Sequence, residues 1–199
     1  MRDRYNHMAS LFDLVEKGGG DSLRRWRRLL WSKVQGENIL EVGVGTGANF
    51  PYYPDGATVT AIDLSTGMLK RAREKAARLN VSVILEEMDV QALRFPDDSF
   101  DTVIASLVFC AVPDPLLGLA EMRRVCKKGC SALFLEHIRS PNRVVGALMD
   151  LLNPLAFWAT GDNFNRRTVA TVAESGFTVE RITDLTGIFK LIEARKPGA

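Results

Sequence analysis

The chain has 199 residues, of which 46% are hydrophobic and 25% are charged, and its formal net charge is +2. This length favours one domain, and the composition excludes a disordered chain, a collagen-like fibre and a disulfide-stabilised miniprotein. A nearly neutral charge argues against a dedicated DNA- or RNA-binding protein, so we expect no nucleic-acid partner.

The chain begins with a helical arm and continues as alternating strands and helices. Gly18, Gly19 and Gly20 divide the arm, and a second helix begins at Asp21 or Ser22, with apolar positions 23, 26, 30 and 34 on one face. Buried strands are predicted over residues 38–42, 58–62, 82–86, 100–106, 131–136, 177–184 and 187–194. Helices are predicted over residues 66–79, 116–126 and 167–175. Such repeated strand–helix units indicate an α/β fold, a Rossmann-like doubly wound sheet of seven strands that is mostly parallel, with an antiparallel last strand.

The three cysteines are Cys110, Cys126 and Cys130. An odd number without a Cys-x-x-Cys pair predicts reduced thiols in a cytoplasmic chain. We expect no metal site, because zinc needs more ligands than these thiols and the two histidines easily offer. The N-terminal residues lack an apolar signal core, and the longest apolar run, residues 144–160, is interrupted by polar residues and a proline.

A glycine-rich segment follows the first predicted strand. Gly43, Gly45 and Gly47 allow positive φ angles and let a ligand lie against bare backbone, and a helix start follows them. Asp63 ends the second predicted strand, where a carboxylate can accept hydrogen bonds from both hydroxyls of a ribose. Because Gly43-x-Gly45-x-x-Ala48 also satisfies the dinucleotide fingerprint, a nicotinamide-dependent oxidoreductase is one alternative.

Two further carboxylates favour a different nucleotide-type ligand. Glu41 precedes the glycines by two positions, which suits a cationic ligand tail and is poorly placed beside a pyrophosphate. Asp89 follows the third predicted strand, where it suits an adenine amino group. An adenosine that carries a cationic amino-acid tail therefore fits this segment better than NAD does.

Four segments resemble, in chain order, the successive motifs of class I S-adenosylmethionine-dependent methyltransferases. They are residues 41–47, 61–65, 88–90 and 100–104. The sequence most resembles the type 11 branch, which includes quinone and phospholipid methyltransferases, and the likeness covers roughly residues 5–192. One departure is Lys127-Lys128-Gly129-Cys130, where the family usually has Lys-Pro-Gly-Gly, and it affects only the detail of that loop.

The resemblance implies S-adenosylmethionine as cofactor and S-adenosylhomocysteine as product, and it implies a role for each matching residue. The methionine part would meet the backbone of the three glycines, and Asp63 would bind the ribose. Leu64 and Met68 would lie beside the adenine, Asp89 and Val90 would hold its edge and ring, and Ser106 and Leu107 would border the sulfonium. On this reading residues 38–136 form the cofactor-binding core of a single domain spanning 1–199, with an arm or lid at 1–35, an acceptor-side insert at 140–168 and a strand pair at 177–194.

Candidate acceptor-side residues lie after the fifth predicted strand and in the arm. His137 has an ordinary pKa near neutrality and follows a strand at the carboxyl end of the sheet, so it is the candidate base; holding a loop is its alternative role. Tyr5 is the second catalytic candidate, as a residue that orients the acceptor or covers the sulfonium. Asn165 and Arg166 are candidates for the acceptor pocket or for an anionic headgroup, although Asn165 also suits a helix N-cap.

An apolar insert and a basic arm suggest an amphiphilic acceptor. Residues 144–158 are rich in leucine and aromatic residues, and the arm places Trp26 and Trp31 among the arginines at 24, 25, 27 and 28. Together they predict a lid that rests on an anionic membrane surface, and ordinary core packing is the alternative.

The leading hypothesis is an S-adenosylmethionine-dependent methyltransferase acting on a small amphiphilic or lipid-like acceptor of the phospholipid-amine or quinone type. An alkyl thiol S-methyltransferase is the alternative, because residues 108–112, 136–137 and 161–165 resemble the membrane-associated members of that group. An oxidoreductase or a non-catalytic binding module represents other classes. The expected location is cytoplasmic, with peripheral attachment to the inner face of a membrane as a further expectation, and the oligomeric state is left open.

Overall fold

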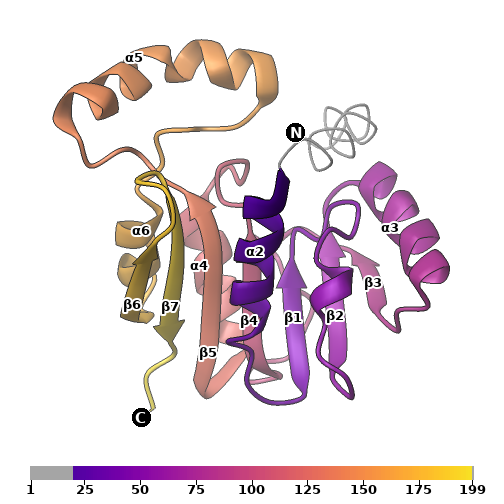
Figure 1. The fold of residues 1–199 in the computed structure, drawn as a ribbon. Coiled ribbons are helices and arrows are strands. Elements are labelled where there is room, and N and C mark those ends of the chain that lie inside the picture. The colour runs from indigo at the N-terminus through magenta and orange to yellow at the C-terminus, as the bar shows by residue number, and fades with distance from the viewer. Residues whose placement is uncertain (1–19, 199) are drawn as a thin grey trace.

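The computed structural model describes residues 20–198 as an α/β structure around one sheet (Figure 1). Its strands are β1 (Asn38–Val42), β2 (Thr58–Asp63), β3 (Ile84–Glu87), β4 (Phe100–Ser106), β5 (Cys126–His137), β6 (Thr178–Asp184) and β7 (Phe189–Arg195). Its helices are α2 (Gly20–Trp31), η1 (Phe50–Tyr52), α3 (Thr66–Leu79), α4 (Pro115–Val125), α5 (Arg143–Thr160) and α6 (Thr168–Glu174).

The sheet has seven strands in the order β3-β2-β1-β4-β5-β7-β6. The five strands from β3 to β5 pair in parallel, whereas β7 runs antiparallel to both of its neighbours. The predicted fold class is therefore confirmed. The strands β1 and β4 are neighbours, and the chain continues from them toward opposite edges of the sheet. Open α/β sheets bind ligands at such a point, beyond the carboxyl ends of the strands.

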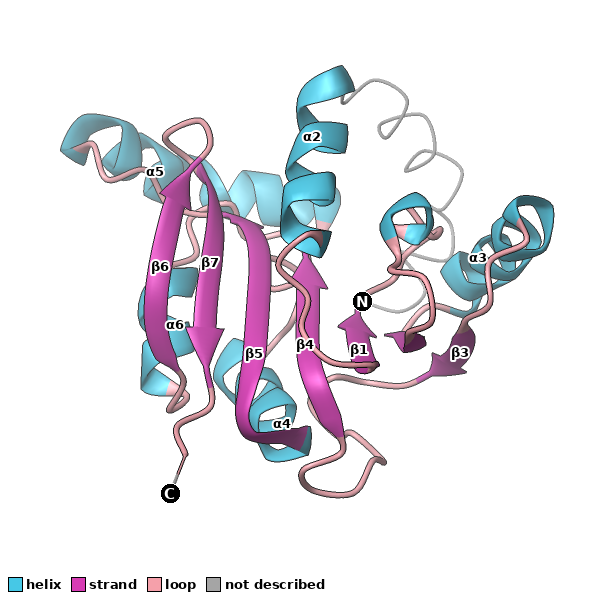
Figure 2. Cartoon of the chain, turned by 60° about the horizontal axis from the view of Figure 1, so that its bottom comes forward, coloured by secondary structure: helices cyan, strands magenta, loops and turns pink. Residues whose placement is uncertain are grey.

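Helices cover both faces of the sheet, as Figure 2 shows. On one face, Leu30 and Trp31 of α2 pack on alternate residues of the central strands, and α3 packs on Ala61 of β2. On the other face, α4 and α6 bury Leu119 and Val172 against the remaining alternate residues. A strand buried on both faces has to be apolar throughout, which is why the central strands form near-continuous hydrophobic runs.

The start of β5 differs from the prediction in two ways. The strand begins at Cys126 instead of residue 131, and its register with β4 shifts between Phe100 and Thr102, so residues 127–130 bulge out of the pairing. This bulge brings Cys126 and Cys130 to a Cα–Cα distance of 5.7 Å, and the structure joins them in a disulfide. The prediction of three reduced thiols is wrong, and Cys110 is a buried free cysteine.

The arm also packs differently from the prediction. Trp31 is buried and its ring lies against Tyr53, while Trp26 contacts Phe189 of β7. Trp31 is therefore part of the core and Trp26 is half-buried against the sheet, so Trp31 does not contribute to the predicted membrane-facing surface. Residues 1–19, which include Tyr5, lie outside the described residues.

Helix α5 lies beyond the carboxyl end of the parallel strands, apart from the two helical layers (Figure 1). Its large apolar side chains are exposed, so core packing of residues 144–158 is excluded. Within residues 20–198, no helix combines the length and the hydropathy that crossing a membrane requires.

Candidate active site

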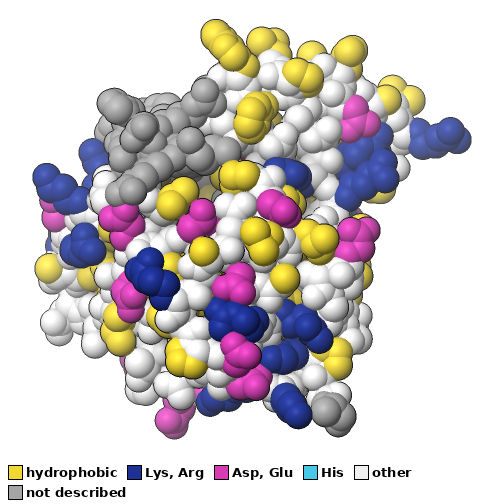
Figure 3. All heavy atoms as spheres, turned by 180° about the vertical axis from the view of Figure 1, so that it is seen from behind, with side chains coloured by type: hydrophobic (Ala, Val, Ile, Leu, Met, Phe, Trp, Pro, Cys, Tyr) yellow, Lys and Arg dark blue, Asp and Glu magenta, His cyan; other side chains and the backbone are white. Residues whose placement is uncertain are grey.

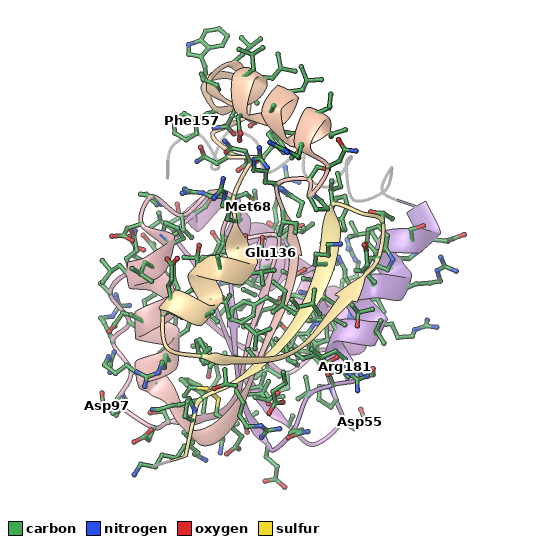
Figure 4. All side chains as sticks on the ribbon, turned by 90° about the vertical axis from the view of Figure 1, so that its left-hand side faces the viewer. Asp55, Met68, Asp97, Glu136, Phe157 and Arg181 are labelled. Atoms are coloured by element: carbon green, nitrogen blue, oxygen red, sulfur yellow. A yellow bond between two sulfur atoms is a disulfide. The ribbon has the colours of Figure 1, made fainter. Side chains whose placement is uncertain are left out.

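A cavity of about 370 Å³ opens where β1, β2, β4 and β5 end. The predicted site residues in its lining are Gly43, Gly45, Asp63, Leu64, Met68, Asp89, Val90, Ser106, Leu107 and His137. In Figure 4, Met68 and Glu136 lie at the end of the sheet that faces α5, whereas Asp55 and Asp97 lie at the opposite end. The structure thus brings residues from five separated segments of the sequence to one cavity.

The glycine loop forms one wall of this cavity through two of its three glycines. Gly43 and Gly45 have φ angles of 68° and 56°, a region that favours glycine. A Cβ on Gly43 would lie 2.4 Å from Val108 Cγ2, whereas the space beside Gly45 is open. Gly47 is not in the lining, because its Cα hydrogen faces the ring of Phe50. The backbone at Gly45 is therefore the part of the loop that a ligand can approach.

Asp63 holds the loop in place and faces the cavity. Its Oδ2 accepts a hydrogen bond from the Gly45 N–H at 2.9 Å, and its Oδ1 accepts one from the Ser65 N–H at 2.8 Å. Burial raises the pKa of Asp63, and these N–H groups act in the opposite direction. Each carboxylate oxygen keeps a second lone pair that can accept a bond from a ligand hydroxyl.

The apolar end of the cavity has the features that an adenine ring needs. Leu64 and Met68 supply apolar contact from the start of α3, and Val90 supplies it from the segment after β3. The Asp89 carboxylate accepts hydrogen bonds from the backbone N–H and the side-chain amide of Gln91. These bonds fix the orientation of the carboxylate in the cavity wall.

A buried polar network lies next to the glycine loop. Glu41 is fully buried and accepts hydrogen bonds from Asn49 Nδ2 at 2.5 Å and from the Tyr53 hydroxyl. Burial raises the pKa of Glu41 to about 7, although both of these bonds lower it. Glu41 is not in the lining of the cavity, and its observed contacts are with Asn49 and Tyr53.

Arg27 enters this network from α2 and also lines the cavity. Its Nη1 donates to Asn49 Oδ1 at 2.9 Å and to Ser106 Oγ at 3.2 Å, and only 9% of the residue is exposed. The prediction that Arg27 is one of four arginines facing an anionic membrane surface is therefore wrong. The cavity therefore presents a guanidinium beside its glycine loop, where a ligand carboxylate can be neutralised.

A buried glutamate positions the loop after β4. Glu136 Oε1 accepts hydrogen bonds from the backbone N–H groups of Val108 at 2.9 Å and Phe109 at 3.2 Å, while its Oε2 has no hydrogen-bond partner. Leu107, next to these residues, has a φ of 59°, which is unusual for leucine. Burial raises the pKa of Glu136 to about 7. The glutamate thus stabilises a strained turn in the cavity wall.

His137 lies where the sequence predicts it, with a neighbour that was not predicted. Its ring stacks on Phe164 with the centroids 5.1 Å apart and the planes at 23°. Asp162 and Phe164 also line the cavity. Burial lowers the pKa of His137, and the Asp162 carboxylate acts in the opposite direction. A neutral imidazole at neutral pH is able to take up a proton from an acceptor.

Two predicted acceptor-side residues lie outside the lining. Asn165 Nδ2 donates to Asp150 Oδ1 of α5 at 3.1 Å, and Arg166 Nη2 donates to the Val112 carbonyl at 2.8 Å. Their observed contacts hold α5 and the loop after β4, and α6 begins without a side-chain cap from Asn165. Tyr5, the other catalytic candidate, lies outside the described residues.

The sequence carried a signal for one of the missed residues. Arg27 lies four positions after Leu23 and three before Leu30, on the apolar face of α2, so its position indicated burial. Asp162 lies in the segment 161–165 that resembles the alkyl thiol methyltransferases, whereas Phe164 had no signal of its own, because its place in the cavity depends on the position of α5. Among residues 20–198, no group of three metal-ligating side chains is present.

Comparisons with known proteins agree with this geometry. Residues 40–134 match the family model described as a methyltransferase domain. A phosphatidylethanolamine N-methyltransferase of Cereibacter sphaeroides is 44% identical over 106 residues, which are 52% of each chain. A demethylmenaquinone methyltransferase of Renibacterium salmoninarum is 42% identical over 117 residues, 57% of this chain and 48% of that protein. The human thiol S-methyltransferase TMT1B is 34% identical over 127 residues, 58% of this chain and 51% of that protein. The chain thus spans about half the length of the curated relatives it matches.

Solved structures share the fold at low sequence identity. A SAM-dependent methyltransferase from Aquifex aeolicus superposes with a TM-score of 0.67 at 19% identity, over 88% of this chain and 89% of that one. The [4+2]-cyclase SpnF superposes with a TM-score of 0.74 at 18% identity, over 88% and 81%. These likenesses show the fold alone, since one fold supports different reactions. Residues 40–134, where the motifs follow one another in chain order, are therefore similar to a methyltransferase domain, and the curated relatives named above are methyltransferases.

Proposed function

We propose that the protein transfers a methyl group from S-adenosylmethionine to a small amphiphilic or lipid-like acceptor of the phospholipid-amine or quinone type. The observation that carries this proposal is that one cavity joins the glycine loop and Asp63 to His137 and Phe164. A donor bound at the first pair and an acceptor bound at the second would share the same enclosed space.

The chain's own residues fit the donor. The open backbone at Gly45 leaves room for a ligand, the Asp63 carboxylate suits the ribose, and the Asp89 carboxylate suits the adenine amino group. Arg27 offers a cation for the carboxylate of the amino-acid tail. These four groups complement the charges and hydrogen-bonding groups of S-adenosylmethionine.

The reaction requires alignment more than strong acid or base catalysis. Bound S-adenosylmethionine supplies an electrophilic methyl group on a sulfonium. Ser106 and Leu107 form the wall beside which the acceptor would be aligned, and Glu136 holds that wall through the Val108 N–H. His137, kept neutral by burial, would take the proton that a protonated acceptor has to lose.

The cavity wall beside His137 includes the apolar ring of Phe164, and α5, whose loop carries Phe164, presents further apolar side chains. This surface suits a greasy acceptor, and the names of two relatives, one for a phospholipid and one for a quinone, support that choice. On this proposal residues 140–168 serve the acceptor, and the protein works at the inner face of a membrane.

A screen of acceptors with isotopically labelled S-adenosylmethionine tests the proposal. Phosphatidylethanolamine, a quinol, simple amines and alkyl thiols are each incubated with the protein, and labelled products are measured by mass spectrometry. We expect label in the phospholipid or the quinol, with little label when Asp63→Asn replaces the wild type. Calorimetry should detect S-adenosylhomocysteine binding and no NADH binding; the reverse result would contradict the proposal and favour an oxidoreductase.

A thiol S-methyltransferase is the second candidate. Two observations favour it: the similarity to human TMT1B and the neutral His137, since a thiol has to lose its proton before it attacks. The two candidates differ in the effect of His137→Gln. That substitution should abolish labelling of a thiol near neutral pH and should slow labelling of a pre-ionised acceptor far less.

A further inference from the structure

The most exposed apolar side chains of the described residues follow a single stripe along α5. Val144, Leu148, Leu151, Leu155 and Trp158 are spaced by three or four residues, so they share one helix face. Each is between 53% and 78% exposed. Figure 3 shows hydrophobic side chains along the upper edge of the molecule, where α5 lies in Figure 1. An apolar face of this length directed to solvent marks an interaction site.

The opposite face of α5 holds the helix to the protein through polar contacts. Asp150 forms a bidentate ion pair with Arg139, with oxygen–nitrogen distances of 2.8–3.0 Å. Asn153 accepts the Phe164 N–H at 2.9 Å and donates to Asn163 Oδ1 at 3.0 Å. Surface helices usually turn their polar side to water and their apolar side to the core. Here the two sides are exchanged, so residues 20–198 leave the apolar face uncovered.

The charge around the stripe points to the partner. Asp150 is the only acidic residue of α5, and its carboxylate faces Arg139 instead of the outer surface. Arg143 at the start of the helix is exposed, as is Arg167 after it. Figure 3 shows Lys or Arg side chains at one end of the hydrophobic edge. An apolar stripe with an aromatic residue, a cationic border and no outward acid fits the interface of an anionic lipid bilayer.

The position of α5 connects this surface to the cavity. The loop after the helix returns to the cavity wall, where the Asn163 N–H donates to the Cys110 carbonyl at 2.9 Å. The same loop supplies Asp162 and Phe164 to the lining. A lipid layer against the outer face of α5 would therefore lie next to the acceptor side of the cavity.

We propose that the outer face of α5, defined by Val144, Leu148, Leu151, Leu155 and Trp158, docks on the interface of an anionic lipid bilayer. The choice of a lipid surface over a protein rests in part on the proposed function, because a lipid-like acceptor resides in that layer. The helix lies along the interface, with its polar side still bonded to the protein.

Vesicle binding of matched variants tests the proposal. Wild type, the double variant Leu151→Asp/Leu155→Asp and the control Leu79→Asp are sedimented with vesicles of equal parts phosphatidylglycerol and phosphatidylcholine. Leu79 is an exposed leucine at the end of α3, so the control adds the same chemistry away from α5. We expect the double variant to bind at least about 100-fold more weakly, through lost insertion and added repulsion, and the control to bind within about twofold of wild type.

Further measurements decide between the possible outcomes. Trp158→Gln, a milder change at a 76% exposed position, should weaken binding by about tenfold and should not alter the melting temperature. Equal vesicle binding by wild type and double variant would overturn the proposal. So would a wild-type dimer in solution that both Asp substitutions dissociate, because a second copy would then be the occupant. S-adenosylhomocysteine affinity should be the same in all variants; vesicle binding without any such affinity would refute the proposed function and leave the docking surface standing.

Discussion

Replacing Asp63 by Asn removes one charge from the cavity and keeps the shape of the side chain. One carboxylate oxygen becomes an amide nitrogen, which can accept neither the backbone N–H bond seen at 2.8–2.9 Å nor a ribose hydroxyl. A hydrogen bond to a charged group contributes about 1.5–3 kcal/mol. We therefore expect S-adenosylhomocysteine to bind about 2–3 kcal/mol more weakly, or some 30- to 150-fold, with a small change in stability because burial already disfavours the charged form of Asp63.

Isothermal titration calorimetry with S-adenosylhomocysteine measures this loss, and thermal melting checks the fold. Asp55→Asn is the matched control, since Asp55 is exposed and lies at the opposite end of the sheet (Figure 4). The control should leave the affinity unchanged. An Asp63→Asn protein that binds within twofold of wild type, or a control that loses as much, would refute the placement of the ribose at Asp63.

Three other predictions test the surroundings of the site. Burial raises the pKa of Glu136 from 4.5 to about 7, so its stabilising contribution is complete below about pH 4.5 and is lost as the pH rises through 7. Relative to Glu136→Gln, the wild type should lose about 2–3 kcal/mol of unfolding free energy between pH 5 and pH 8 in denaturant titrations, and parallel pH profiles would contradict this. Arg27→Gln should weaken S-adenosylhomocysteine binding about tenfold or more, whereas Arg24→Gln, whose side chain is 64% exposed, should not; equal effects would show that Arg27 has no ligand role. Reduction of the Cys126–Cys130 disulfide should raise the number of titratable thiols in the denatured chain from one to three and lower stability by at most about 2 kcal/mol, without changing ligand affinity, because the loop it closes is short and lies at the far end of β5.

The parallel sheet was predictable because each central strand is buried on both faces. The predicted bounds of the strands at 38–42 and 100–106 and of the helix at 66–79 are confirmed. The part of the cavity that we propose for the cofactor follows from these elements, since its residues come directly after strand ends. This is why a local pattern was enough to single out Gly45 and Asp63, which both line the cavity.

The remaining features depend on three-dimensional relations that hydrophobicity does not encode. Residues 144–158 have the composition of a core helix, and composition alone does not tell whether the apolar face meets protein or another apolar medium. The polar partners that turn this face outward, Arg139 and Asn163, lie outside the helix. The disulfide likewise depends on a bulge in β5 that brings Cys126 and Cys130 together, and spacing alone gave no sign of it.

The strand order has a consequence for how this molecule can change over generations. Every group proposed to hold the donor, except Arg27, follows β1, β2 or β3, whereas His137 and Phe164 follow β5, on the other side of the point where the sheet reverses. Variation in the loops after β4 and β5 and in α5 can therefore alter the preferred acceptor while the donor half keeps its sequence. The topology thus places the proposed donor site and the proposed acceptor site on different strands. Selection can therefore change the preferred acceptor while the residues proposed to bind the donor stay the same.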